Sequence, residues 1–122
     1  MALSISSAGL ASGIKVYKQS VTNGTATKNL TGTTAMVYLV VLDNTANAAA
    51  SYLKFYNNVN PTVGTTDPDF IIMAPSTTKL TMHIPSGIAF STALSIACVT
   101  AGGTAGVTNP TSSVLTYIEA SE

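Results

Sequence analysis

Charged side chains are scarce in this sequence of 122 residues, which contains 8% Asp, Glu, Lys and Arg and has a formal net charge of zero. An ordinary soluble domain carries about 25% charged residues. The five basic residues are all lysines, so the clustered positive charge that binds nucleic-acid phosphates is missing and no nucleic-acid partner is expected. Weak charge gives little repulsion between copies, which favours a protein whose surface is covered in an assembly.

Cysteine is almost absent, since Cys98 is the only one. An intrachain disulfide is therefore impossible, and synthesis in a reducing compartment is permitted. The segment Met1–Ile5 has no basic start followed by a long apolar run, and no window approaches the roughly 20 apolar residues of a membrane span. We expect a protein that is made in the cytoplasm, is not processed and has no membrane partner.

Residues that favour strands and turns fill the sequence instead. Hydrophobic residues make up 46%, and the 19 Thr and 13 Ser residues favour strands and turns, respectively. Alternating or apolar stretches of strand length recur about every ten residues, without an internal repeat or a linker. The sequence therefore predicts a single all-β domain over residues 1–122, a sandwich or jelly roll of about eight short antiparallel strands.

The expected strands differ in their predicted burial. Met36–Leu42 is continuously apolar and is expected to be a central strand covered on both faces, and Phe70–Met73 is expected to be a short buried strand. The residues Pro85–Gly87 are expected to turn the chain. Residues 1–12 show no clear period, so a flexible or partner-docked arm is expected there. The expected strands are Ile14–Ser20, Met36–Leu42, Tyr52–Tyr56, Phe70–Met73, Leu80–Ile84, Ile88–Phe90, Leu94–Val99 and Val114–Glu119.

Catalytic and metal-binding patterns are weak. His83 is the sole histidine, and Ser86 and two carboxylates lie nearby, but the Gly-x-Ser-x-Gly elbow is missing and His83 falls on the polar side of an alternating strand. Asp67 and Asp69 offer too few oxygens for calcium and are explained by turn formation beside proline. Cys98 is expected to be a small buried hydrophobe. We therefore expect no enzyme, no cofactor and no metal.

An aromatic patch is the one candidate for a binding surface that alternation predicts. Tyr52, Lys54 and Tyr56 share one face of a strand, and Lys15 and Tyr17 share a face of another. Tyrosine suits surfaces that are apolar at one end and wet at the other, so a protein interface or a sugar platform could use this patch. The alternative is that a second sheet covers these residues.

Three segments carry a resemblance to a known family. They are Ser51–Asn57 (SYLKFYN), Pro61–Pro68 (PTVGTTDP) and Ile84–Thr92 (IPSGIAFST). In this order they resemble small β-sandwich proteins of tailed-phage virions, which serve as capsid decoration or cement proteins or as head-fibre-like modules. Relatives of this type often have a basic residue and a glycine where this chain has Ala89 and Ala93.

The resemblance implies a virion structural protein, a capsid cement or decoration subunit that is made in the host cytoplasm and lies on the capsid exterior. It would bind the lattice of the major capsid protein, stabilise the head and self-associate, with a homotrimer expected. The alternative is a tail-fibre or receptor-binding module that recognises host surface glycans. The residues expected at the interface are Leu3, Ile5, Leu10, Tyr17, Tyr52 and Tyr56.

Overall fold

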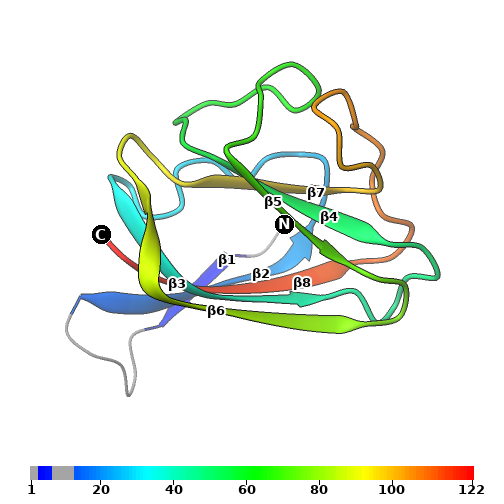
Figure 1. The fold of residues 1–122 in the computed structure, drawn as a ribbon, viewed down its shortest axis with the longest axis horizontal. Coiled ribbons are helices and arrows are strands. Elements are labelled where there is room, and N and C mark those ends of the chain that lie inside the picture. Colours follow the sequence, from blue (N-terminus) through cyan, green and yellow to red (C-terminus); the bar gives the residue numbers. More distant parts are fainter. Residues whose placement is uncertain (1–2, 7–12) are drawn as a thin grey trace.

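Two antiparallel β-sheets face each other around one apolar core (Figure 1). They are seen in a computed structural model that describes residues 3–6 and 13–122. Every regular element in these residues is a strand, which confirms the predicted all-β sandwich. No helix in the described part of the chain is long and apolar enough to cross a membrane. The strands are β1 (Leu3–Ser6), β2 (Ile14–Thr22), β3 (Ala35–Asp43), β4 (Ser51–Tyr56), β5 (Phe70–Ala74), β6 (Lys79–Phe90), β7 (Ser95–Val99) and β8 (Val114–Ser121).

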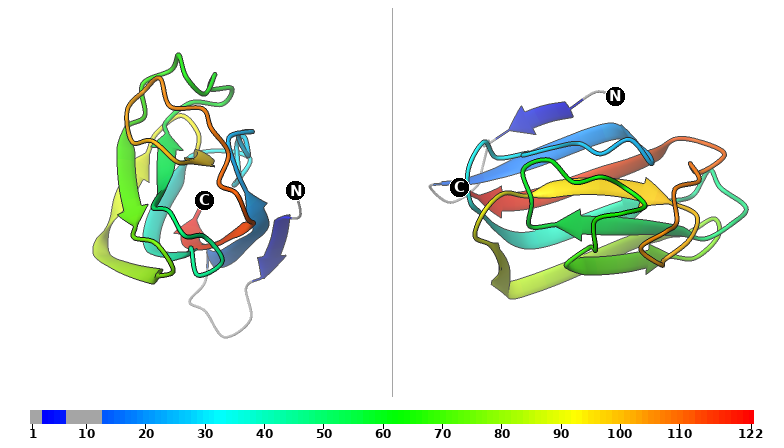
Figure 2. Two further views of the ribbon diagram at one scale, coloured as in Figure 1. Left: turned by 90° about the vertical axis from the view of Figure 1, so that its right-hand side faces the viewer. Right: turned by 90° about the horizontal axis from the view of Figure 1, so that it is seen from above.

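The two sheets differ in width. The larger sheet has the strand order β1-β2-β8-β3-β6, and the smaller sheet has the order β5-β4-β7. The chain crosses from β3 in the larger sheet to β4 in the smaller one, returns at β6 and crosses again to β7. A single bridge between Thr27 and Ile96 joins the β2–β3 connection to β7. Figure 2 shows the two layers from the side, with β1 at the outer edge of the larger sheet.

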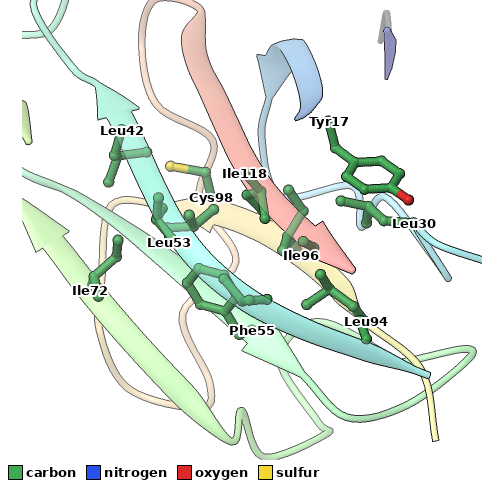
Figure 3. Packing of buried hydrophobic residues seen from close by; sticks show 14 of the residues in the cluster. Tyr17, Leu30, Leu42, Leu53, Phe55, Ile72, Leu94, Ile96, Cys98 and Ile118 are labelled. Carbon is green, nitrogen blue, oxygen red and sulfur yellow. The ribbon is translucent and has the colours of Figure 1, made fainter. Parts of the chain in front are cut away.

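The core lies between the sheets because successive side chains of a strand point to opposite faces. β8 alternates between buried and half-buried positions along its whole length, as a strand with one covered face should. Phe55 of β4 lies at the centre, with its ring centroid 5.5 Å from that of Phe70 and 6.1 Å from that of Phe90. Figure 3 shows how side chains of both sheets, Leu53 and Ile118 among them, meet there. Each such side chain contributes roughly 1.5–3 kcal/mol on burial.

The prediction that Met36–Leu42 is covered on both faces is wrong. The segment forms most of β3, which lies between β8 and β6 in the larger sheet. Val37 and Val40 are buried, whereas Tyr38 and Val41 are only half-buried. The smaller sheet covers one face of β3, and no second layer of strands lies on the other face in the described residues. The continuous apolar run of β3 therefore forms a strand with one buried face and one half-buried apolar face.

The predicted turn at Pro85–Gly87 is also absent, because β6 continues through these residues. Its pairing with β3 shifts register between Val37 and Leu39, so the extra residues of β6 form an irregular bulge. Gly87 has a φ of 77°, and an added Cβ would lie 2.5 Å from Cγ of Met36. Glycine is therefore required at the bulge, which joins two segments that were expected to be separate strands.

The predicted arm at residues 1–12 contains a strand. β1 pairs antiparallel with β2, with Leu3 opposite Gln19 and Ile5 opposite Tyr17. All four residues of β1 are exposed. Leu10 lies outside the described residues. The N-terminal segment therefore adds an edge strand to the larger sheet.

Candidate interaction surface

On the outer face of the smaller sheet, β4 is covered by the chain's own loops. Lys54 points away from the core, as predicted, but it is buried with 0% exposure. Its Nζ donates to the carbonyl oxygens of Gly103 at 2.5 Å and Gly106 at 3.0 Å. Burial disfavours the ammonium and lowers the pKa of Lys54. The β7–β8 loop is thus fastened across β4, and Lys54 offers no charge to a partner.

The two carboxylates of the candidate calcium loop also hold loops in place. Asp67 Oδ1 accepts a hydrogen bond of 2.8 Å from Thr104 Oγ1, which joins the β4–β5 loop to the β7–β8 loop. Asp69 Oδ2 accepts from the backbone N–H of Asn57 at 2.7 Å. Within residues 3–6 and 13–122, no three His, Cys, Asp or Glu side chains gather as metal ligands. Both carboxylates therefore have structural partners in the loops that close this face.

The predicted aromatic patch is not exposed. Tyr17 has 2% exposure and lies on the core side of β2 beside Leu30 (Figure 3). Tyr56 has 0% exposure, and burial raises its pKa. Tyr52 is half-buried against the β7–β8 loop, where a Cβ at Gly102 would lie 2.9 Å from its ring. These tyrosines are covered, as in the alternative prediction, although Tyr52 lies under a loop and not under a second sheet.

The remaining candidate chemistry is dispersed. His83 is exposed on β6, and Ser86 is exposed in the bulge of the same strand. No hydrogen bond joins His83 to Ser86 or to Asp67 or Asp69 in the described part of the chain. Cys98 is fully buried in the core, as predicted, and burial raises the pKa of its thiol to about 12. These described side chains are therefore not hydrogen-bonded to one another in the way that a catalytic triad requires.

A small polar cavity of about 160 Å³ lies where the β2–β3 connection meets the segment before β8. One amide at this cavity is already used, because Asn109 Oδ1 accepts from the backbone N–H of Gly24 at 2.9 Å. Among the described residues, no charged side chain lines the cavity. The lining residues are Val21, Thr22, Asn23, Asn109, Pro110, Thr111, Ser112 and Ser113.

The edge of the larger sheet at β1, in contrast, is open. Leu3 is 39% exposed and Ile5 is 55% exposed. Their pairing with Gln19 and Tyr17 places both on the core-facing side of the sheet. The larger sheet is wider than the smaller one, so β1 extends beyond the strands that would cover it (Figure 2). We call Leu3–Ile5 the open edge.

A second exposed apolar pair was missed from the sequence. Ile71 is 37% exposed and Met73 is 44% exposed, both on β5, which was expected to be a buried strand. The segment Phe70–Met73 contains no polar residue, so its pattern does not show which side chains face outward. Burial of Ile72 between them shows that only one face of β5 contacts the core.

Comparison with known proteins finds no relative of this chain: no protein-family model, curated protein or solved structure matches it. The open edge and the closed face of the smaller sheet therefore have to be interpreted from their own geometry. An uncharged edge strand with exposed apolar side chains is suited to contact with another protein strand.

Proposed function

We propose that this chain is a capsid cement or decoration subunit of a tailed-phage virion, which binds the lattice of the major capsid protein on the capsid exterior. The observation that carries the proposal is the open edge. It presents Leu3 and Ile5 on a neutral sandwich whose polar loops are bonded to one another. Such a surface is suited to assembly, and the resemblance of the three segments supplies the virion context.

The strand connections support the proposal at the level of the fold, which we propose is a jelly roll. In that fold two Greek keys interlock in two four-stranded sheets. Here β2-β8-β3-β6 would form one sheet, and the Thr27 bridge with β7-β4-β5 would form the other, with the second strand of the roll reduced to one bridge. β1 is then an addition to the roll. A fold alone does not define a function, so this agreement is secondary to the open edge.

Cementing would act by mass action. A subunit that binds only the assembled lattice lowers the free energy of the assembled state by an amount that grows with its concentration and affinity. Apolar and Thr/Ser-rich surface would be buried across the joints between capsomers. Low charge keeps repulsion between crowded copies small. The subunits are proposed to associate as homotrimers on this lattice.

The glycan-binding alternative has lost the observation that favoured it. It relied on Tyr17, Tyr52 and Tyr56 as an aromatic platform for sugars. Tyr17 and Tyr56 are buried, and Tyr52 is partly covered by a loop. A tail-fibre or receptor-binding role therefore has no exposed aromatic platform among these residues, and we favour the cement role.

The test uses phage particles prepared with and without this protein. Particles that lack it should release their genome at a lower temperature, and adding the purified chain back should restore the original release temperature. Quantitative mass spectrometry should find many copies per particle, as lattice coverage requires. Unchanged heat resistance in particles without the protein would refute the cement role.

A further inference from the structure

We propose that β5 pairs with β5 of a second copy of this chain, antiparallel and across a two-fold axis perpendicular to the smaller sheet. The inference goes beyond the cement role and does not depend on it. β5 is the terminal strand of its sheet, and no other described strand pairs with its outer side. Figure 2 shows β5 on the side of the sandwich opposite β1, and the residues that flank β5 are all described. A terminal strand is a template for another strand.

The backbone of β5 presents Ile71 and Met73 to a partner. On β7, the N–H groups of Ile96 and Cys98 donate to the β2–β3 connection at 3.0 and 2.8 Å. The other residues of β7 therefore bond β4, because the backbone groups of successive residues in a strand point to opposite sides. Through the registers of β4 with its two neighbours, this alternation assigns the bonds between β4 and β5 to the even-numbered residues of β5. The N–H and C=O groups of Ile71 and Met73 therefore point outward.

The same two residues carry the exposed side chains of β5, and the strand is held in place at both ends. Before β5, the Asp69 carboxylate accepts from the backbone N–H of Asn57 at 2.7 Å. After β5, the carbonyl oxygen of Pro75 accepts from Asn44 Nδ2 at 2.9 Å. A strand that is already ordered loses little conformational entropy when it pairs. β5 is therefore prepared for a partner.

Two other sheet edges carry features that hinder pairing. β6 exposes Lys79 and His83, and its ladder is interrupted by the bulge with Pro85. β7 is covered by the segment at Thr27, whose backbone exchanges hydrogen bonds of 2.8 and 3.0 Å with Ile96. Charges, prolines, bulges and covering segments are the usual protections of an edge strand. β5 itself contains none of them, and its register with β4 is unbroken.

The residues at the ends of β5 select one register for the second copy. With Ile72 opposite Ile72, Ile71 lies opposite Met73 in both directions, and all outward backbone groups of these two residues find partners. Opposite residues of an antiparallel pair share a face, so the exposed side chains of both copies gather on the outer face. The five apolar residues of β5 then oppose only one another.

A slip by two residues in either direction is unfavourable. With Ile71 opposite Ile71, Met73 meets Asp69, whose charge would lie in the contact and whose N–H already donates to Phe55 at 2.8 Å. With Met73 opposite Met73, Ile71 meets Pro75, which has no N–H to offer. The window between the two flanking prolines therefore fits a second copy of itself in one register.

The expected contact is weak in dilute solution and stronger among crowded copies. A five-residue strand buries far less than the roughly 1,600 Å² of a standard protein interface. On the core side, half-buried Phe70 of β5 lies next to the contact and adds apolar surface. Copies held close together pair at high effective concentration, which raises the occupancy of a weak contact. A two-fold contact uses a different axis from a trimer, so it is compatible with the proposed homotrimer.

Disulfide trapping of the purified chain tests both the contact and its register. Ile71 lies opposite Met73 of the second copy with a Cα separation of about 5.5 Å, within the range that a disulfide spans. Two copies of Ile71 are diagonal neighbours about 7–8 Å apart, which a disulfide does not span without backbone movement. Mild oxidation of a mixture of I71C and M73C, one of them carrying a size tag, should therefore give covalent heterodimers. Each variant alone should give little product, and buried Cys98 should not interfere.

We expect about tenfold more heterodimer than either homodimer, because pairing makes the reaction effectively intramolecular. An excess of wild-type chain should suppress the product by occupying the edge. Met73→Pro removes an outward N–H without a bond to β4, so the folded variant should not compete. Met73→Leu, which keeps this N–H, and Val59→Lys, at a loop residue with 51% exposure, should compete like the wild type.

Dominant homodimers would reveal a slipped register, and products without preference would reveal random collision, so either result would overturn the pairing. Chains that cross-link as expected but do not bind particles would refute only the cement role. Chains that bind particles but show no preference for the heterodimer would refute only the pairing of β5.

Discussion

β4 in the smaller sheet and β1 at the edge of the larger sheet differ in how they are covered. The chain's own loops cover β4, whereas the apolar side chains of β1 are exposed. β4 lies under loops that Lys54 and Asp67 tie together, and the Lys54 ammonium has its hydrogen-bond partners within the chain. β1 is the terminal strand of its sheet among the described strands and has exposed apolar side chains. The difference teaches that side-chain hydrogen bonds between loops are concentrated over β4. Assembly contacts are expected where such bonding is missing.

The buried side-chain amide of Asn44 also holds the segments next to β4 and β5 in place. Asn44 follows β3 and has 0% exposure. Its Nδ2 donates to the carbonyl oxygens of Ala49 and Pro75, both at 2.9 Å, and its Oδ1 accepts from Ser51 Oγ at 2.7 Å. These bonds fasten the entry to β4 and the exit from β5. A buried polar atom that loses its hydrogen-bond partner destabilises the fold by the desolvation free energy of that atom.

The largest effect on the closed side is expected from Asn44→Ala. It would remove the buried amide that bonds Ala49, Pro75 and Ser51, so the free energy of unfolding should fall by about 2–4 kcal/mol. Urea denaturation measures this loss. Asn60→Ala, at an exposed loop amide, is the control and should change the stability by less than about 0.5 kcal/mol. Equal effects of the two substitutions would contradict the closed-face account.

Lys54→Met should loosen the loop that closes β4. The change removes two charge-assisted hydrogen bonds but keeps an apolar stem, so a loss of about 1–3 kcal/mol is expected. Limited proteolysis should then cut the β7–β8 loop faster than in the wild type. Lys79→Met, at an exposed lysine, provides the comparison. A Lys54 variant with unchanged cleavage would show that the loop is held by other contacts.

The burial of Cys98 predicts a dependence of stability on alkaline pH. Its thiol has a pKa of about 12 in the folded chain against an ordinary value of 9.0, so it contributes no pH dependence below pH 9. Above pH 9 the unfolded chain loses this proton first, and stability should fall by up to about 1.4 kcal/mol per pH unit. Comparing wild type with Cys98→Ala by denaturation at pH 8 and pH 10 isolates this slope. Identical slopes would mean that the thiol is accessible.

The smallest effect on stability is expected at the open edge. Ile5→Lys places a charge on a residue that is already 55% exposed, so the free energy of unfolding should change by less than about 0.5 kcal/mol. The same substitution should weaken binding to particles, because a charge and its hydration would have to be buried in the contact. A large loss of stability would show that Ile5 supports the fold instead of presenting a surface.

The sequence predicts most of the sandwich because its strands alternate or are apolar over a suitable length. Val40 and Leu42 of β3 and the alternating residues of β8 are buried as their pattern requires. The predicted boundary between Leu80–Ile84 and Ile88–Phe90 is wrong because Pro85 and Gly87 lie in a bulge of β6. These residue types occur in turns as well as in bulges, so the sequence does not distinguish the two. Residues 1–12 show no clear period, so the sequence did not distinguish the four residues of β1 from an arm.

The candidate surface was harder to predict than the fold. Alternation places Lys54 and Tyr52 on the outward face of β4, but it contains no information on which loop returns over them. Two of the expected interface residues, Tyr17 and Tyr56, are covered by contacts between segments far apart in the chain. Exposure of Leu3 depends on the relative width of two sheets, which is a property of the whole fold.

Binding to capsids tests the central claim most directly, namely that the open edge makes the assembly contact while the closed face holds the fold. Particles that lack this protein would be incubated with wild-type chain, Ile5→Lys or Val59→Lys, and both bound protein and the temperature of genome release would be measured. We predict that wild type and Val59→Lys bind and restore heat resistance, whereas folded Ile5→Lys does neither. Full binding and rescue by Ile5→Lys would contradict the account.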